Sequence, residues 1–171
     1  MLTNSIEHLK KYISVEKSKK KIIGMVSGGF DPIHKGHVDY ILHASKMCDV
    51  LIVVVNGDSF LKRKKGYAFM SLEERCYICR NIKGVDYVYG FESNSDTVDE
   101  AIKDIHPDIF FKGGDRTGPE NIPEWAICQM LSIDLVIGVG GGKTQSSSDL
   151  VLKQRTHVVT GDEGEHGQRC A

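Results

Sequence analysis

The sequence predicts an α/β fold: a Rossmann-like five-stranded parallel sheet with helices on both faces, plus an N-terminal helix. Two observations support this prediction. From residue 21 onward, short apolar runs alternate with amphipathic stretches, which is the pattern of strands joined by helices. The run 50–55 is continuous and rich in β-branched residues, as is typical of a strand buried on both faces of a parallel sheet. Such a strand needs helices on both sides.

Local patterns predict the individual elements. Apolar residues recur at helical spacing between Ile6 and Ile13 and predict a helix within 1–20. The capping box Ser71–Glu74 begins the helix that carries Arg75, and Pro107 closes a later helix that ends at His106. The predicted strands are 21–27, 50–56, 85–90, 108–112 and 134–139, and the other predicted helices are 36–47, 72–82, 97–105, 122–131 and one from about 147.

Length and charge limit the possible classes of protein. The 171 residues suit one domain, and we expect a helical extension at 1–20, a domain at 21–155 and a polar, mobile tail at 156–171. The formal net charge of −1 argues against nucleic acid or an anionic membrane as the main partner. No apolar run approaches the ~20 residues of a membrane span, and the N-terminus lacks a signal peptide's apolar core. We therefore expect a cytoplasmic protein.

The five cysteines are an odd number, and the first four lie in predicted helices or, for Cys48, directly after one. This suits reduced thiols better than a disulfide framework. Cys76 and Cys79 have the spacing of zinc ligands, but they lie within one predicted helix and no second pair follows. This favours a place in the core or on the helix surface over metal binding, and no metal-ligating residues are predicted.

The segment 29–38 follows the first predicted strand and opens a helix. Its two histidines, His34 and His37, share one face of that helix, and a helix N-terminus attracts anions through its free amides and its dipole. Pro fixes its own φ and Asp bonds nearby backbone, so the preceding turn is rigid. The sequence therefore predicts a phosphate site with two imidazoles directed at it. Its other predicted members are Gly28, Gly29, Phe30, Asp31 and Gly36.

The motif His34-Lys35-Gly36-His37 resembles the HxGH motif of the nucleotidyltransferase superfamily, and the resemblance runs from about residue 21 to about residue 153. It implies an enzyme in which both histidines bind the nucleotide and act in catalysis. They would donate hydrogen bonds to the α-phosphate of a nucleoside triphosphate and to the bridging oxygen as it leaves.

Ligands of open parallel sheets bind beyond the carboxyl ends of the strands. After the second predicted strand come Asn56 and Asp58, expected to bind substrate, and then the basic loop 62–65. In that loop we expect Lys62 and Lys65 to capture phosphates and act in catalysis, although a nuclear localisation signal or a solvated loop would have the same composition. Asp31 is also expected at the substrate. So is Arg75, which resembles a superfamily arginine near the phosphates, although a surface salt bridge explains it equally well.

The loop after the fifth predicted strand contains a triple glycine and then Ser146, Ser147 and Ser148. These serines form a second anion cradle or a plain helix cap. They resemble the superfamily's ISSTxx motif, which binds the β- and γ-phosphates, whereas Lys143 stands where related enzymes carry an arginine.

The segment 112–115 resembles the KGGD motif of heptose-phosphate nucleotidyltransferases. Further nucleotide-binding residues implied by these resemblances are Lys112, Gly114, Asp115 and Lys143.

The resemblance implies attack by a small phosphorylated acceptor, such as a heptose or another sugar phosphate, on the α-phosphorus of ATP or CTP. Mg²⁺ would arrive on the nucleotide and keep several waters. Alternatives are a CTP-dependent enzyme for glycerol phosphate or a phosphorylated amino alcohol, a non-catalytic nucleotide-binding module, and a fragment of a class I aminoacyl-tRNA synthetase. Two histidines at one phosphate argue against the module, and the short chain argues against the synthetase. A homodimer is possible.

Overall fold

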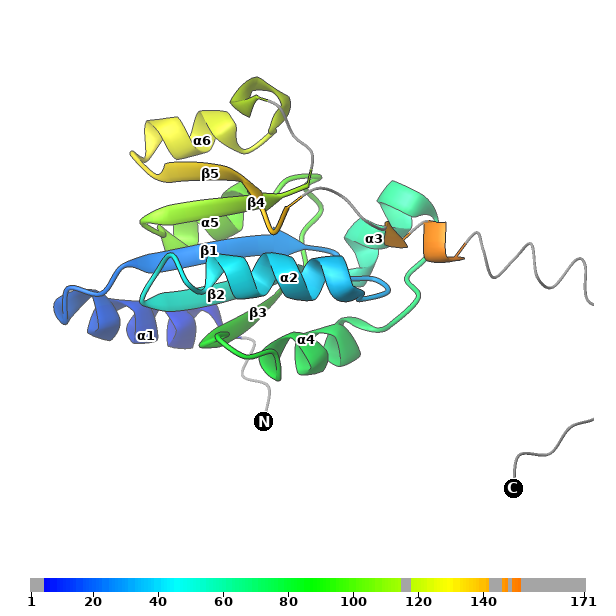
Figure 1. Ribbon diagram of the computed structural model, residues 1–171, viewed down its shortest axis with the longest axis horizontal. Coiled ribbons are helices and arrows are strands. Elements are labelled where there is room, and N and C mark those ends of the chain that lie inside the picture. Colours follow the sequence, from blue (N-terminus) through cyan, green and yellow to red (C-terminus); the bar gives the residue numbers. More distant parts are fainter. Residues whose placement is uncertain (1–4, 115–117, 142–145, 148, 152–171) are drawn as a thin grey trace, which may run out of the picture.

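The computed structural model describes residues 5–114, 118–141, 146–147 and 149–151. Within them, five strands form one sheet in the order β3-β2-β1-β4-β5, and every neighbouring pair is parallel, which confirms the predicted sheet (Figure 1). The strands are β1 (Ile23–Gly28), β2 (Val50–Asn56), β3 (Tyr87–Phe91), β4 (Ile109–Gly113) and β5 (Asp134–Val139).

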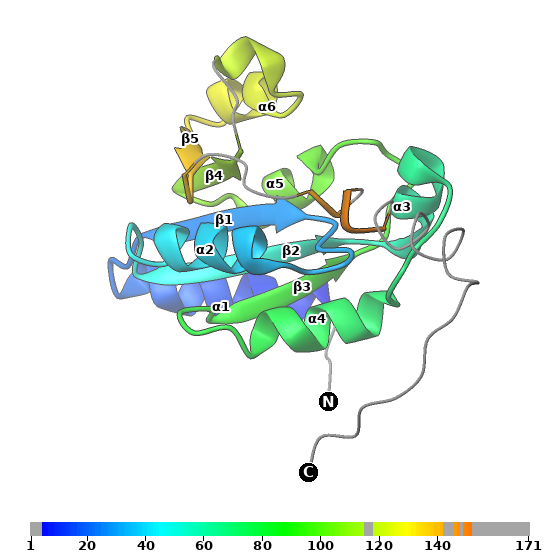
Figure 2. The same cartoon turned by 45° about the vertical axis from the view of Figure 1, so that its right-hand side comes forward.

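The helices are α1 (Ile6–Ser18), α2 (Lys35–Ala44), α3 (Asp58–Lys65), α4 (Leu72–Arg80), α5 (Asp99–Ile105) and α6 (Trp125–Met130), with a 3-10 turn at Pro119–Asn121. Helices α2 and α4 cover one face of the sheet, and α1, α5 and α6 cover the other (Figures 1 and 2). Residues 147 and 149–151 are also helical. The helices on both faces are as predicted.

The central strand β2 explains why both faces need cover. All seven of its residues are buried, and its side chains alternate between two cores. Ile52 and Val54 belong to the core under α1, α5 and α6, whereas Leu51 and Val53 belong to the core under α2 and α4. Burying each such aliphatic side chain contributes about 1.5–3 kcal/mol, so the two layers of helices hold the sheet from both sides.

The N-terminal helix α1 packs on the chain's own sheet. Leu9 and Ile13 are buried in one core with Ile102 and Ile105 of α5. At the edge of this contact, the Lys10 ammonium lies 2.6 Å from an Asp104 carboxylate oxygen. The apolar stripe of α1 that predicted the helix is thus the surface that it buries against the domain.

Helix α3 corrects the prediction of a basic loop at 62–65. It spans Asp58–Lys65 and ends at Gly66, which adopts a left-handed conformation with φ of 87°. Leu61 is its single buried residue, so the segment has no apolar stripe to reveal a helix. Its other signals are typical of one: an acid in the first turn, bases in the last turn and a glycine after the end.

The sheet order reverses between β1 and β4, which are neighbours in space. Strand β1 leads to α2 on one face, and β4 leads to α6 on the other. The loops that leave these strands therefore diverge and open a crevice at the carboxyl edge, where ligands of such sheets bind.

Among the described residues, no helix is long and apolar enough to cross a membrane. Cys76 and Cys79 are buried thiols of α4 in the core under α2 and α4, which agrees with the core role expected from the sequence. Within the same residues, no cluster of three or more His, Cys, Asp or Glu side chains could hold a metal ion.

Candidate functional site

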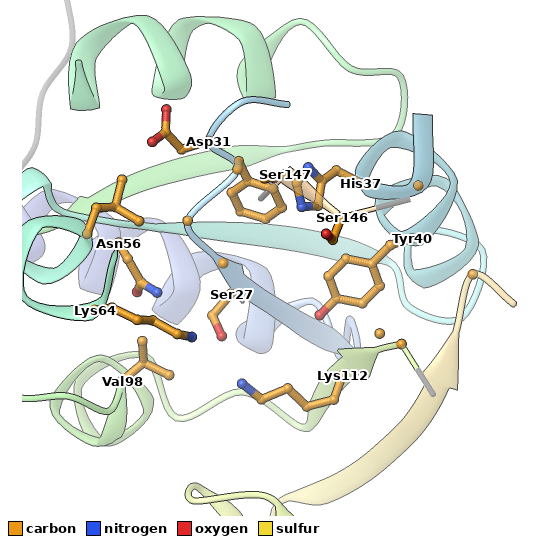
Figure 3. Close-up of a pocket in the computed structure, with 18 of the residues that line it drawn as sticks. Ser27, Asp31, His37, Tyr40, Asn56, Lys64, Val98, Lys112, Ser146 and Ser147 are labelled. Atoms are coloured by element: carbon orange, nitrogen blue, oxygen red, sulfur yellow. The ribbon is translucent and has the colours of Figure 1, made fainter. Parts of the chain in front are cut away.

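A cavity of about 470 Å³ lies in the crevice at the carboxyl edge of the sheet (Figure 3). Every strand sends residues to it, either from its own end or from the loop that follows. The lining residues include Ser27, Gly28, Gly29, Phe30, His34, His37, Tyr40, Asn56, Phe60, Lys64, Lys65, Asp96, Thr97, Val98, Lys112, Gly114, Glu124, Gly140, Ser146 and Ser147. The structure therefore brings most of the predicted site residues to one volume.

His34 begins helix α2 and caps it with its own side chain. Its Nδ1 accepts a hydrogen bond from the backbone N–H of Gly36 at 3.1 Å. A neutral imidazole with an accepting Nδ1 carries its proton on Nε2, so the Nε2–H of His34 is available as a hydrogen-bond donor. Gly36 is needed for this contact, because a Cβ at residue 36 would lie 3.1 Å from a carbon of the His34 ring.

His37 lies parallel to His34, with the two ring centroids 3.8 Å apart, and Phe30 meets it edge-on. Burial, the neighbouring His34 and the Lys65 ammonium lower the pKa of His37 to about 4. Burial also lowers the pKa of His34. Both rings are therefore neutral at pH 7, which removes the repulsion that two stacked imidazolium ions would have.

Ser146 and Ser147 line the cavity beside His37 (Figure 3). The Ser147 hydroxyl donates to the backbone carbonyl of Pro32 at 2.9 Å, which ties the two loops together. The Ser146 hydroxyl accepts from the backbone N–H of Asp149 at 3.1 Å and so caps the short helix. The serine segment is thus both a helix cap and a wall of the cavity. The predicted nucleotide-binding residues Asp115, Lys143 and Ser148 lie outside the described residues, as does the tail 156–171.

Gly140 brings the end of the fifth strand against helix α2. Its φ is 91°, and an added Cβ would lie 2.8 Å from the Cα of Tyr40. Tyr40 is buried, and its hydroxyl donates to the carbonyl of Phe111 at 2.6 Å. A side chain at residue 140 would therefore have to displace backbone that is fixed by a buried hydrogen bond.

Lys65 and Asp31 bind each other and are not free for a ligand. The Lys65 ammonium lies 2.8 Å from the Asp31 carboxylate and also donates to the Asp31 carbonyl. The same carboxylate accepts from the backbone amides of Phe69 and Met70. Burial raises the pKa of Asp31, but Lys65 and the two amides outweigh burial and lower it. In Figure 3 the carboxylate points away from the other labelled side chains.

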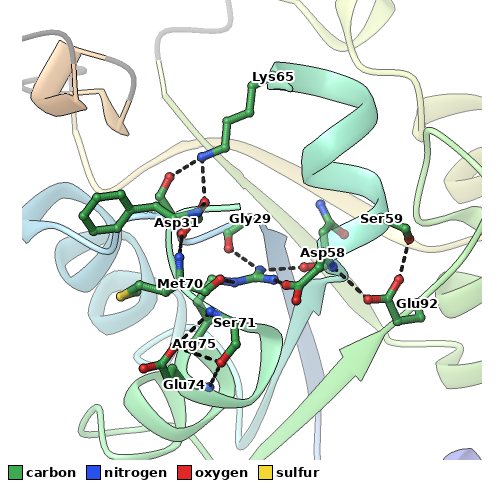
Figure 4. A network of polar contacts seen from close by, with 12 residues as sticks. Gly29, Asp31, Asp58, Ser59, Lys65, Met70, Ser71, Glu74, Arg75 and Glu92 are labelled. Carbon is green, nitrogen blue, oxygen red and sulfur yellow. Dashed lines mark hydrogen bonds and ion pairs between the residues drawn. The ribbon is translucent and has the colours of Figure 1, made fainter. Parts of the chain in front are cut away.

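Arg75 is fully buried and holds four segments together (Figure 4). Its guanidinium donates to the carbonyls of Gly29, Asn56 and Met70 at 2.6–3.0 Å and pairs with the Asp58 carboxylate. Because all of these partners belong to the protein, Arg75 and Asp58 hold the walls of the cavity in place. Arg75 forms a salt bridge, as one reading of the sequence expected, but the bridge is buried and not on the helix surface. Arg75 is also absent from the cavity lining.

Lys62 is exposed and absent from the cavity lining, whereas Lys64 reaches the cavity (Figure 3). Sequence reasoning missed Lys64. It also missed residues 92–98, the β3–α5 loop, because the end of the third strand carries none of the glycines that marked the other loops. This loop brings Asp96, Thr97 and Val98 to the cavity.

Three lining residues have a buried polar atom with no hydrogen-bond partner within the described part of the chain. They are Nδ1 of His37, Oδ1 of Asn56 and Oε2 of Glu124. The other Glu124 oxygen lies 3.1 Å from the Lys112 ammonium. An unsatisfied buried polar atom costs about 1–3 kcal/mol, so these three residues are candidates for hydrogen bonds to a ligand in the cavity that they line.

Residues 25–132 match the family described as cytidylyltransferase-like. Among curated proteins, the chain is similar to the "Bifunctional protein HldE" of Campylobacter concisus, with 37% identity over 136 residues, which are 78% of this chain and 28% of that protein. The protein of the same name from Haemophilus ducreyi is 42% identical over 118 residues, 68% of this chain and 24% of that protein. The chain thus spans about a quarter of the length of these relatives.

Among solved structures, a lipopolysaccharide core biosynthesis protein from Thermoplasma volcanium is 27% identical, with a TM-score of 0.58 over 69% of this chain and 94% of that chain. Pantoate-beta-alanine ligase from Francisella tularensis also has a TM-score of 0.58, over 84% of this chain and 70% of that one. At 16% identity, this second likeness concerns the fold alone.

Proposed function

The chain belongs to the cytidylyltransferase-like family of nucleotidyltransferases, and from this premise we propose that it transfers a nucleoside monophosphate from a nucleoside triphosphate to a sugar phosphate of the heptose type. Pyrophosphate is the second product. The observation on which this depends is the pair of neutral imidazoles, His34 and His37, in the same cavity as Ser146 and Ser147. The similarity to a lipopolysaccharide core biosynthesis protein supports a sugar as the acceptor.

The triphosphate would lie against the histidines and the serines, which line the same cavity. His34 lines the cavity and carries its proton on Nε2, because its Nδ1 accepts from the N–H of Gly36. A donor fixed before the reaction stabilises the charge that grows on the phosphoryl oxygens without having to reorganise. The neutral His37, with its pKa of about 4, would donate likewise. The acceptor's phosphate oxygen attacks the α-phosphorus directly while pyrophosphate leaves, so no covalent enzyme intermediate is needed.

Lys64 would attract the acceptor phosphate. It lines the cavity from α3, a different wall from that of the serines. A phosphate bound near Lys64 and a triphosphate bound at the serines would meet at the histidines between them, which is the arrangement that direct displacement requires. Mg²⁺ would enter on the triphosphate and neutralise part of its charge.

Pyrophosphate release tests the proposal, measured with ATP, CTP, GTP and UTP against heptose 1-phosphate and other sugar phosphates. We expect one nucleotide to support turnover and to raise the melting temperature in the presence of Mg²⁺. His34→Ala and His37→Ala should both release pyrophosphate far more slowly. Equal rates in the wild type and both variants would refute catalysis by the histidines.

The same assay separates the alternatives. Turnover with CTP and glycerol phosphate, but with no sugar phosphate, would indicate a CTP-dependent cytidylyltransferase for glycerol phosphate. Nucleotide binding without turnover on any acceptor would indicate a binding module. The cytoplasmic location and the homodimer expected from the sequence remain predictions, and light scattering of the purified chain tests the second.

A further inference from the structure

One side of the cavity is not used by the groups that bind the triphosphate. It is formed by the end of β2, by α3 and by the β3–α5 loop, which contribute Asn56, Lys64, Asp96 and Thr97. Figure 3 shows Asn56, Lys64 and Val98 grouped on this side, apart from His37 and Ser146. A ligand here would approach His37 and the two serines from the side of Asn56 and Lys64.

The β3–α5 loop is held in one conformation before any ligand arrives. From α3, the Arg63 guanidinium donates to the carbonyls of Ser93 and Ser95 at 3.0 and 2.9 Å and to the Asp96 carboxylate at 3.3 Å. The Ser95 hydroxyl accepts from the backbone N–H of Thr97 at 3.2 Å. Because these contacts fix the loop, the side chains that it brings to the cavity need little ordering when a ligand binds.

The side-chain oxygen of Asn56, on this side of the cavity, accepts no hydrogen bond from the described residues. The residue is only 8% exposed, and its Oδ1 has no hydrogen-bond partner among the described residues. Its backbone carbonyl is already bonded to Arg75, which anchors the strand end independently of the side chain. The side-chain oxygen is therefore left to accept a hydrogen bond from a molecule in the cavity.

The chemistry of these groups suits a chain of hydroxyls that ends in a phosphate. An amide oxygen, a carboxylate and a hydroxyl all accept hydrogen bonds from alcohols, and Lys64 is a cation for the phosphate. A ligand with an ammonium group fits less well, because Asp96 already pairs with Arg63 at 3.3 Å and Lys64 adds a second positive charge.

We propose that Asn56, Asp96 and Thr97 bind hydroxyl groups on the carbon chain of the acceptor while Lys64 holds its phosphate, so that the site selects polyhydroxylated phosphates over phosphorylated amino alcohols. This inference rests on the proposed function and deepens it. It assigns a specificity role to the β3–α5 loop, whose side chains take no part in the transfer itself.

Two variants test the assignment. Thr97→Val removes one hydroxyl at nearly constant volume, together with its 3.2 Å contact to the Ser95 hydroxyl. Asn56→Leu removes the unpartnered amide oxygen. Asn94→Ala is the matched control, since Asn94 is an exposed residue of the same loop outside the cavity lining. Calorimetry without nucleotide measures binding of heptose 1-phosphate, glucose 1-phosphate and O-phosphoethanolamine. Pyrophosphate release gives KM for the same acceptors and for the nucleotide.

We expect the sugar phosphates to bind the wild type more tightly than O-phosphoethanolamine does. Thr97→Val and Asn56→Leu should each weaken sugar phosphate binding about tenfold, as the loss of one hydrogen bond predicts, with KM for the nucleotide unchanged. Asn94→Ala should match the wild type. Melting temperatures of both variants at or above that of the wild type would show that the lost affinity does not come from unfolding.

The inference is overturned if O-phosphoethanolamine binds as well as the sugar phosphates, or if neither variant changes their affinity. Turnover of sugar phosphates with unaltered KM in both variants would leave the proposed function standing and refute the hydroxyl site. Conversely, sugar phosphate binding that both variants weaken, without any pyrophosphate release, would support the site and refute the transferase.

Discussion

Two polar regions border the same cavity and differ in one respect. Around Asp31 and Arg75, charged groups are buried with their hydrogen bonds supplied by the protein, including backbone groups of Gly29 and Met70. At Asn56 and Glu124, buried polar atoms remain without partners among the described residues. The first region is complete without a ligand and serves structure, whereas the second is incomplete and is suited to binding. Hydrogen-bond satisfaction therefore separates the two roles better than residue type does.

Removal of Arg75 should have the largest effect on stability. Arg75→Leu leaves the Asp58 carboxylate and three carbonyls without their donor, and breaking a buried ion pair in this way costs about 3–5 kcal/mol. Urea denaturation measures the loss. Arg80→Leu is the control on the same helix, because Arg80 is exposed, and it should stay within about 0.5 kcal/mol of the wild type. Similar losses in the two variants would contradict the structural role of Arg75.

His34→Asn separates helix capping from chemistry. Asparagine is a good N-cap and can accept from the N–H of Gly36 as His34 does, but it cannot present the Nε2 proton. We expect kcat for pyrophosphate release to fall about 10²–10³-fold, as for the loss of one oxyanion donor, with little change in melting temperature. An unchanged kcat would place the essential donor elsewhere.

His37 should make the protein less stable in acid. The pKa of its side chain is about 4 in the folded chain, against 6.5 for an ordinary histidine, so the unfolded chain binds more protons between these values. The free energy of unfolding should therefore fall as pH drops from 6.5 to 4, with a slope of up to about 1.4 kcal/mol per pH unit. Urea titrations of His37→Gln should show a shallower slope, although His34 still contributes. Equal slopes would contradict the burial of His37.

Lys64 and Lys62 should give the smallest and most discriminating comparison. Lys64→Ala removes a cation that lines the cavity and should raise KM for the acceptor phosphate about tenfold, since charge-assisted hydrogen bonds contribute about 1.5–3 kcal/mol. Lys62→Ala removes an exposed cation outside the lining and should leave KM unchanged. Acceptor titrations at saturating nucleotide measure both, and equal effects would indicate that general electrostatic attraction matters more than position.

The sequence predicted the sheet and the histidine site because both depend on local patterns. Buried strands are continuous apolar runs, and the two histidines lie close together in the chain, one as the N-cap and one in the first turn of the same helix. Lys64 shows what was missing. Once residues 58–65 are known to be a helix, its period places Phe60, Leu61, Lys64 and Lys65 on the face toward the cavity and Lys62 on the other face. As long as residues 62–65 were expected to form a loop, nothing in the sequence distinguished Lys64 from Lys62.

Asp31 and Arg75 could not have been assigned from the sequence alone. The amides that bind the Asp31 carboxylate are 38 and 39 residues away along the chain, and a carbonyl bonded to Arg75 is 46 residues away. No spacing rule relates such positions. Charged residues beside a phosphate motif therefore suggested substrate binding, when tertiary contacts had already used their hydrogen bonds.

Three of the four segments that Arg75 joins are held through backbone carbonyls, which every amino acid possesses. The contact itself therefore does not depend on the side chains at Asn56 and Met70, whereas at Gly29 an added Cβ would lie 2.8 Å from Leu61. Asn56 is the notable case, since its carbonyl supports the scaffold while its amide faces the cavity. Substitutions at residue 56 offer an evolutionary route to new acceptors in which the architecture is inherited intact.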